Sequence, residues 1–477
     1  MSPFVSADIA PNAQPYRIID MTHSTVAPAG EKQKRRAVLA SYIGTTLEYY
    51  DFLLYGVAAA LVFPKIFFVS LDPLAATLSS FATFAVGYFA RPLGAVVFGH
   101  YGDKLGRKNV LIVTLIIMGL SSVLIGLLPT YNQVGVLAPV LLVLLRLLQG
   151  IAIGGEWGGA TLMSMEHAKP RGRGFAVSLV SAGGPTGAVL GTLVMTPFTL
   201  LPPEQFLGWG WRVPFLISAL LVVLGLIVRM AVTETPEYEA ARKAQAARGG
   251  PKTIPLVTVF RYNKGHVISG VLGGLAPLSF ATFAAAFLLN YSVEVGHTRT
   301  SALIALTIAN FLNIFTLPLF GALSDRVGRR PLMITGALAG VVLIWPIFLL
   351  VHSPSFLALL LAMVLAMPVI QALMGGVFNT WLSEKFAADV RYSGIALTFQ
   401  VASTLGAGLS PLIATSLLAF SPNHSPEWVA VYFGAICLIS CIAYALGHER
   451  FDKELDTFTV PEEGTEAPSG GVRKQLV

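Results

Sequence analysis

A ten-residue phrase occurs twice in this chain, and the two copies lie 222 residues apart. The first runs from Gly99 to Lys108 (GHYGDKLGRK) and the second from Gly321 to Arg330 (GALSDRVGRR). Glycine, aspartate, glycine and two cations keep their places without a gap, and each copy separates two long apolar segments. The duplication predicts two related halves, each a set of membrane helices joined by charged hairpins. Such halves are typical of a protein that rocks one half against the other.

The composition indicates a membrane protein. Hydrophobic residues make up 55% of the chain and charged residues only 12%, with a mean hydropathy of +0.71. A soluble protein of 477 residues needs far more charge to cover its surface. We predict an all-α integral membrane fold in two pseudo-symmetric six-helix bundles, because twelve segments can each cross a bilayer of about 30 Å. They are residues 37–63, 74–99, 108–128, 135–165, 174–200, 212–232, 265–294, 301–323, 331–350, 356–383, 393–420 and 428–447.

The placement of the basic residues orients the chain. Of its 32 Lys and Arg residues, three (Lys65, Arg212 and Arg299) fall on one side and two (Arg91 and Arg146) lie within segments, which leaves 27 on the side of the termini. The positive-inside rule then makes both termini cytoplasmic. The net charge of +7 is thus a topology signal and gives no reason to expect a nucleic-acid partner.

The same division predicts the domain organisation. We expect a cytoplasmic N-terminal tail at 1–36, bundles at 37–232 and 265–448, a basic cytoplasmic linker at 233–264, and a cytoplasmic, disordered tail at 449–477. Residues 1–36 lack the apolar core of a cleavable signal peptide. Whether residues 1–20 are translated stays open, because Met21 offers a second start.

The duplicated phrase predicts a cytoplasmic gate. Its glycines allow a tight turn and close helix packing. Its aspartate can pair with a cation of a neighbouring helix or accept hydrogen bonds from a helix N-terminus. The alternative is a basic hairpin that contains one acid and has no gating role. The candidate gate residues are Gly99, Asp103, Gly106, Arg107, Lys108, Gly321, Asp325, Gly328, Arg329 and Arg330.

Two acids in the first apolar segment are candidates for proton coupling. Glu48 and Asp51 lie three residues apart, so they share one helix face. Carboxylates in a membrane cost several kcal/mol unless they are paired, protonated or facing water. The pair suits a proton carrier, and the alternative is a structural ion pair with a buried arginine. Tyr50 and Tyr55 of the same segment are candidate substrate contacts.

Arg91 and Arg146 are the possible partners of these acids. A guanidinium that is always charged either pairs with an acid at membrane depth or binds an anionic substrate. Arg146 is the stronger substrate candidate, because Gln149, itself a candidate substrate contact, lies on nearly the same helix face. A structural role for Arg91 is equally open, since Pro92 and the gate are close by.

Further candidates lie in the fourth segment and in the second half. Gly154 to Gly159 reads GGEWGG, in which Glu156 is a third proton-coupling candidate and Trp157 a possible aromatic wall of the site. Packing around an internally paired Glu156 is the alternative. The second half has fewer charges within its segments, and there Gln371 and Asn379 are candidate neutral contacts to substrate, although such residues also join helices.

Several phrases together resemble the metabolite:H+ symporter family of the major facilitator superfamily. The likeness covers roughly residues 37–447, with the phrases at 48–56, 91–94, 99–108, 146–150, 154–159, 208–214, 234–237 and 391–394. The resemblance implies a multi-pass protein of the bacterial inner membrane that imports a metabolite with protons, for which no cofactor beyond the proton gradient is needed. Relatives carry shikimate, 2-oxoglutarate, citrate and other carboxylates, or proline and betaines.

An uptake carrier for a small organic acid is the leading hypothesis, and we expect it to work as a monomer in the lipid bilayer. The arginines of the first half favour an anionic solute. A proline/betaine-type carrier is less expected, because the tail lacks a long coiled coil. Gly184-Pro185-Thr186-Gly187 leaves drug/H+ antiport open, and a sensor that binds without transport is a further alternative. Neither an enzyme nor a metal site is expected, because no nucleophile motif, phosphate-binding loop or spaced His/Cys set is present.

Overall fold

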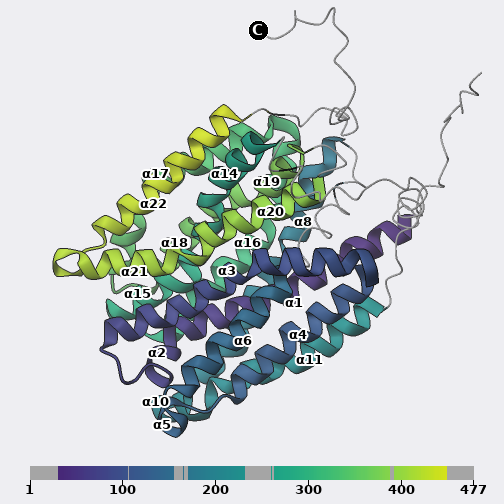
Figure 1. Cartoon of the computed structure of the whole chain (residues 1–477). Helices are drawn as coiled ribbons and strands as arrows, with labels where there is room; N and C mark the ends of the chain where they lie inside the picture. The colour runs from purple at the N-terminus through teal and green to yellow at the C-terminus, as the bar shows by residue number, and fades with distance from the viewer. Residues whose placement is uncertain are drawn as a thin grey trace, which may run out of the picture.

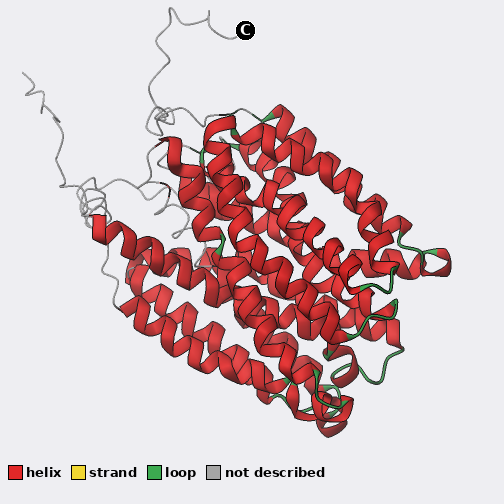
Figure 2. Ribbon diagram, turned by 180° about the vertical axis from the view of Figure 1, so that it is seen from behind, coloured by secondary structure: helices red, strands yellow, loops and turns green. Residues whose placement is uncertain are grey.

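The chain forms a bundle of long helices, shown by the computed structural model in Figure 1. The structure describes residues 31–105, 107–154, 165, 170–230, 259, 263–386, 391–447 and 449. Within this part of the chain every regular element is helical (Figure 2). Ten helices there are long and apolar enough to cross a membrane, and α1 and α4 occupy the positions of the two remaining predicted segments. The predicted all-α membrane fold is confirmed.

The described part of the first half contains six long helical segments. They are α1 (Glu31–Leu61), α3 (Pro73–Leu105), α4 (Arg107–Leu127), α6 (Leu137–Gly154), α8 (Arg173–Ser181) continued by α9 (Gly183–Thr199), and α11 (Arg212–Met230). Short elements connect them, namely α2 (Phe63–Ile66), α5 (Tyr131–Val134), η1 (Pro170–Gly172), α10 (Pro203–Gln205) and η2 (Phe206–Gly210).

The second half repeats this arrangement. Its segments are α14 (Lys264–Thr282) with η3 (Phe283–Leu288) and α15 (Leu289–Glu294), α16 (Arg299–Val327), α17 (Arg329–His352), α18 (Phe356–Val364) with η4 (Leu365–Gln371) and α19 (Ala372–Ser383), α20 (Arg391–Ser403) with η5 (Thr404–Gly408) and α21 (Ser410–Phe420), and, after η6 (Pro422–His424), α22 (Glu427–Leu446). The elements η2 to η5 are π-helical turns; the last three lie inside membrane-length helices, and π-turns are frequent at functional sites.

Both copies of the duplicated phrase end a long helix at the same place. α3 ends at Leu105 and α16 at Val327, again 222 residues apart. The predicted segments 74–99 and 301–323 stop too early, because hydropathy marks the apolar part of a helix and not its charged last turn. In the second copy the turn is Gly328 alone, whose φ of +101° favours glycine.

The helix pairs within each half correspond. In the first half α3 packs on α6, α1 on α9, and α4 on α11. In the second half α16 packs on α19, α14 on α20 and η5, and α17 on α22. Since each pair has its counterpart at the same position in the other half, the sequence repeat is also a structural repeat.

Two further helix pairs join the halves. α16 lies along both α8 and α9, and α3 lies along α20, η5 and α21 (Figure 1). Hydroxyl pairs mark the first of these contacts, with 3.0 Å between the Oγ1 atoms of Thr199 and Thr300 and 2.7 Å between those of Thr192 and Thr307. In the second contact, the Thr404 hydroxyl donates to the carbonyl oxygen of Tyr88 over 3.1 Å.

Candidate functional site

Arg146 lies at the centre of a buried polar cluster in the first half. It projects from α6 and is only 1% exposed. Its Nη1 donates to Oε1 of Gln149, one turn further along the helix, over 3.1 Å. Its Nε and Nη2 have no hydrogen-bond partner among the described residues. The guanidinium therefore binds the protein through Nη1 and leaves its Nε–Nη2 edge without a partner.

Aromatic rings surround this guanidinium. The centroid of the Tyr55 ring lies 4.0 Å from the Arg146 Cζ, that of Phe52 lies 4.8 Å away, and that of Phe84 lies 5.1 Å away. The Tyr55 hydroxyl donates to Oγ1 of Thr83 over 2.7 Å. Cation–π contacts stabilise the charge without using its N–H groups, so the hydrogen-bonding capacity of Arg146 stays available.

Asp51 lies near Arg146 but is bound by hydroxyl groups. Its side chain projects from α1 and is buried, and its Oδ1 accepts from the Ser218 hydroxyl of α11 over 2.6 Å. Ser122 of α4 also interacts with this carboxylate, and the charge of Arg146 acts on it. Gln149 donates from Nε2 to the Ser122 Oγ over 2.7 Å. Side chains from α1, α4, α6 and α11 thus meet around Asp51.

Arg91 and Glu48 are two further buried charged residues near Phe52 and Tyr88. The Arg91 Cζ is 4.6 Å from the centroid of Phe52 and 4.2 Å from that of Tyr88, and its Nε has no hydrogen-bond partner among the described residues. Glu48 is buried, and its charge and that of Arg91 both act on Tyr88. The Phe52 ring therefore contacts both guanidinium groups.

The structure brings some predicted contacts to this cluster and places others elsewhere. Tyr50 is buried, and its hydroxyl donates to the carbonyl oxygen of Pro214 over 2.8 Å, at the junction of α1 with the start of α11. Gln371 accepts from Nδ2 of Asn313 over 2.9 Å within the second half. Asn379 donates to Oγ of Ser181 over 3.1 Å and so joins the two halves.

Some predicted site residues fall outside the described part of the chain. Glu156, Trp157 and Gly106 lie outside the described residues, and the side chains of Asp103, Arg107 and Lys108 are not described. Gly99 lies within α3.

A close approach of α3 and α6 positions Arg146. An added methyl at Gly87 would lie 2.5 Å from the Arg146 Nε. At Gly150, one turn beyond Arg146, a methyl would lie 2.1 Å from the carbonyl oxygen of Gly87. At Gly150 the closest neighbour is backbone, so this packing requires glycine there, whereas a methyl at Gly87 would force the Arg146 side chain to shift.

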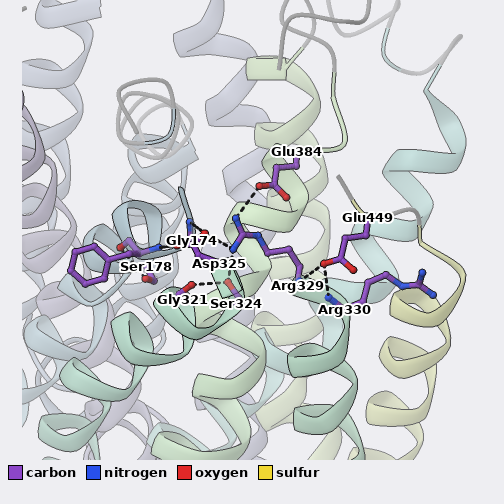
Figure 3. A network of polar contacts seen from close by, with 10 residues as sticks. Gly174, Ser178, Gly321, Ser324, Asp325, Arg329, Arg330, Glu384 and Glu449 are labelled. Carbon is purple, nitrogen blue, oxygen red and sulfur yellow. Dashed lines mark hydrogen bonds and ion pairs between the residues drawn. The ribbon is translucent and has the colours of Figure 1, made fainter. Parts of the chain in front are cut away.

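The second copy of the repeated phrase takes part in a polar network between the two halves (Figure 3). We call this network the Asp325 cluster. It consists of Asp325, Arg329, Glu384 and the backbone N–H groups of Gly174 and Phe175. Oδ1 of Asp325 accepts from the backbone N–H of Gly174 over 2.9 Å, and Oδ2 from that of Phe175 over 3.0 Å. These groups lie in the first turn of α8, where free N–H groups and the helix dipole attract a carboxylate.

Arg329 links this carboxylate to the rest of the second half. Its Nη1 lies 2.7 Å from Oδ1 of Asp325, and its Nη2 lies 3.1 Å from Oε1 of Glu384, just beyond α19. Burial raises the pKa of Glu384 above its usual value, although the charge of Arg329 acts in the opposite direction. The network holds together the ends of α8, α16, α17 and α19.

The end of α22 is attached to the same turn. The Glu449 carboxylate accepts from the backbone N–H of Arg329 (Figure 3). The Arg330 Nε donates to the carbonyl oxygen of Tyr444 over 2.9 Å. Glu449, just beyond α22, thereby satisfies a free N–H group at the start of α17, and Arg330 of α17 satisfies a free carbonyl group at the end of α22.

Four important neighbours of the cluster were not predicted from the sequence. Phe52, Ser122, Ser218 and Phe84 all contact Asp51 or Arg146. Phe52 is adjacent to Asp51 in the chain, which offered a signal. The two serines had none, because a serine in an apolar helix most often bonds to its own backbone.

Among the described residues, no three His, Cys, Asp or Glu side chains are grouped so that they could hold a metal ion. The polar groups of the described cluster are a guanidinium, carboxyl groups, hydroxyl groups and an amide.

Comparison with known proteins places this arrangement in a family. The family model described as Major Facilitator Superfamily matches residues 39–411 and, in a second match, 269–473. The shikimate transporter of Escherichia coli (strain K12) is 40% identical over 414 residues, which cover 86% of this chain and 94% of that protein. The inner membrane metabolite transport protein YhjE of the same strain is 38% identical over 432 residues, covering 88% and 96%.

A solved structure shows the same fold. The crystal structure of a D-xylose-proton symporter superimposes with a TM-score of 0.68 at 19% identity, and the match covers 86% of this chain and 97% of that one. At this identity the likeness concerns the fold, which has the paired six-helix bundles described above. The chain belongs to the Major Facilitator Superfamily and is a multi-pass membrane transporter.

Proposed function

We propose that this protein imports a small organic acid together with protons across the bacterial inner membrane. The observation that carries the proposal is the buried Arg146, whose Nε and Nη2 are without hydrogen-bond partners while Asp51 lies close by and is bound by hydroxyls. An anion would bind at the first group and a proton at the second.

The state of Arg146 supports an anionic substrate. A buried guanidinium is costly where its desolvation is not fully offset by pairing and hydrogen bonds. The Nε–Nη2 edge carries two N–H groups that can bind a carboxylate in a bidentate manner. A substrate carboxylate at this edge would supply the missing partner. Tyr55 and Gln149 hold the guanidinium in place for it.

The state of Asp51 supports proton coupling. A carboxyl group bound by serine hydroxyls can accept hydrogen bonds when ionised and donate one when protonated. Because it is buried at membrane depth, its charged form is costly, and protonation removes that cost. We assign Asp51 as the proton carrier, with Glu48 and Glu156 as further candidates.

The contacts between the halves support alternating access. The Asp325 cluster closes one end through α8 and α16, and it would have to open for release on that side. At the opposite end of α16, Thr300 contacts Thr199 of α9. We assign the Asp325 cluster to the cytoplasmic side, where the basic residues predict it. One chain supplies both bundles, so a monomer suffices.

Shikimate is the first substrate to test. The relative that is 40% identical over most of both chains is a shikimate transporter. Shikimate combines one carboxylate with hydroxyl groups, which suits a site that has one free guanidinium edge and neutral polar groups. Gln371 and Asn379 are the second-half residues that we propose to face such groups once their present contacts open.

Uptake into proteoliposomes tests the proposal. The purified protein would be given radiolabelled shikimate, 2-oxoglutarate, citrate and proline in turn, under an inward proton gradient and with or without a protonophore. We expect one acid to accumulate and the protonophore to abolish its accumulation. If only proline accumulates, the anionic-substrate proposal is wrong. If folded protein accumulates none of the four, import of these solutes is excluded and export by antiport becomes the next hypothesis.

A further inference from the structure

We infer that Ser122 and Gln149 form a relay that couples protonation of Asp51 to anion binding at Arg146. This inference rests on the proposed function and assigns a role to two residues that neither bind the proton nor need to touch the substrate. Both are fully buried, with exposed fractions of 0% and 1%.

The hydrogen bonds run in one direction. Arg146 donates from Nη1 to the amide oxygen of Gln149 over 3.1 Å, and Gln149 donates from its amide nitrogen to the Ser122 Oγ over 2.7 Å. Ser122 interacts in turn with the Asp51 carboxylate. Both of these donors point from the cation towards Ser122, which lies next to the anion.

The Ser122 hydroxyl has one proton and two acceptors. One acceptor is the carbonyl oxygen of Met118, one turn back in α4, at a long distance of 3.2 Å. The other is the Asp51 carboxylate. When Asp51 is ionised, the charge favours the bond to Asp51, because hydrogen bonds to charged groups are stronger. When Asp51 is protonated, this advantage disappears and the hydroxyl can return to Met118.

This change affects Arg146 through Gln149. A chain of hydrogen bonds polarises cooperatively, so an ionised Asp51 strengthens each link and draws the guanidinium into the chain. Protonation weakens the links and leaves more of the positive charge of Arg146 for a substrate carboxylate. The proton and the anion then bind cooperatively, and by linkage each raises the affinity of the other equally.

The relay replaces a direct ion pair. Arg146 uses Nη1 for Gln149 rather than for Asp51, and Asp51 takes its closest hydrogen bond from Ser218. A direct pair would occupy the guanidinium itself, whereas the relay keeps its Nε–Nη2 edge free. Other titratable and charged groups near Asp51 in the described chain are Tyr50 and Glu48 on α1 and, against the Phe52 ring, Arg91 on α3. The side-chain hydrogen bonds that lead from Arg146 towards Asp51 run through Gln149 on α6 and Ser122 on α4.

Equilibrium binding at two pH values tests the relay. The probe is radiolabelled shikimate, or the acid of the uptake panel that the wild-type protein accumulates, and the readout is the ratio of Kd at pH 8 to Kd at pH 6. We expect a wild-type ratio of about 10 or more, since coupling between sites commonly changes affinity by about 5- to 150-fold. Ser122→Ala should bind at pH 6 within about 3-fold of wild type and lower the ratio to below about 3.

Ser121 provides the matched control. It is the next residue of α4, it is also buried, and its hydroxyl donates to the carbonyl oxygen of Ile117 over 2.7 Å, outside the relay. Ser121→Ala should keep the wild-type ratio. Gln149→Met removes the amide while it keeps much of the volume, and it should also flatten the ratio. If Ser122→Ala does not fold, the ratio of Kd at pH 8 to Kd at pH 6 in Gln149→Met decides whether the relay exists.

The outcomes separate the relay from the proposed function. A wild-type ratio that persists in Ser122→Ala and Gln149→Met contradicts the relay and leaves proton-coupled transport in place. A folded wild-type protein that binds no acid at either pH contradicts the anionic-substrate proposal, and the relay falls with it. A ratio flattened in Ser121→Ala as strongly as in Ser122→Ala would show a general effect on α4 and would also overturn the relay.

Discussion

At the scale of the residue, the first half contains an arginine that divides its hydrogen-bonding groups between two uses. Nη1 of Arg146 bonds to Gln149, the ring faces of Tyr55 and Phe52 contact the guanidinium, and the Nε–Nη2 edge has no partner in the described chain. Only an arginine can hold one partner through one nitrogen and offer a planar N–H edge to a second, because a lysine ammonium is a point charge without a planar edge.

Arg146→Lys should therefore impair transport although it keeps the charge. Loss of bidentate binding removes a charge-assisted hydrogen bond worth about 1.5–3 kcal/mol, so we expect the KM for uptake to rise by roughly 10-fold or more. The KM is measured in proteoliposomes. Arg212→Lys is the control, because Arg212 binds backbone carbonyl oxygens, those of Gly126 and Leu128 at the end of α4. Wild-type affinity in Arg146→Lys would exclude Arg146 as a substrate contact.

The sequence indicated which charged residues matter but not their surroundings. Arg146 and Asp51 could be found because charges are rare in apolar segments. Their partners Ser122 and Ser218 could not, because helical periodicity does not tell which face meets which neighbour in a bundle that is buried in protein and lipid. Tyr50 illustrates the same limit, since it lies beside Asp51 in the chain but points to Pro214.

At the scale of the element, the crossing of α3 and α6 determines where Arg146 lies. The crossing is close because Gly87 and Gly150 have no side chains, as the distances of added methyl groups show. The sequence predicted close packing of glycine-rich helices in general. It could not identify Gly87 as the neighbour of the guanidinium, because that contact depends on the angle between two helices.

Gly87→Ala should displace the guanidinium and weaken transport. The added methyl would lie 2.5 Å from the Arg146 Nε, and overpacking of this kind costs about 1–3 kcal/mol. We expect uptake at low substrate concentration to fall by about 10-fold while the protein stays folded in size-exclusion chromatography. Gly434→Ala on α22 is the control, because an added methyl there meets nothing within 4 Å. Equal, small effects of the two substitutions would show that this crossing does not position Arg146.

At the scale of the whole molecule, two bundles of corresponding helix pairs meet through α16 with α8 and α9 and through α3 with α20, η5 and α21. Hydropathy and the repeated phrase were enough to predict this architecture, since apolar length defines spanning helices and duplication defines halves. The sequence indicated that Asp325 can cap a helix N-terminus, but it could not identify which helix is capped. The partner is α8, whose Phe175 is 150 residues away from Asp325 in the chain.

Asp325→Asn should slow turnover and leave substrate binding nearly unchanged. The neutral amide weakens both the bond to Arg329 and the cap of α8, so the Asp325 cluster closes less firmly. We expect the rate of exchange of labelled substrate to fall by several-fold, because the cluster loses about 1 kcal/mol or more of stabilisation. The Kd for substrate should stay within about 2-fold of the wild-type value. Arg326→Gln is the control, because this neighbour is exposed. Lost binding with normal exchange would contradict the assignment of the cluster as a gate.

The most direct test of the central claim is to measure proton entry and substrate entry together. Proteoliposomes that contain the wild-type protein and an internal pH indicator would receive radiolabelled shikimate, or the acid selected by the uptake panel, without an imposed gradient. We predict that acid entry acidifies the lumen in a fixed ratio to the label. In Asp51→Asn the label should exchange without proton entry, while Asp72→Asn, which changes an exposed acid before α3, should behave as wild type. Substrate entry without proton movement in the wild-type protein, or full coupling in Asp51→Asn, would contradict the account.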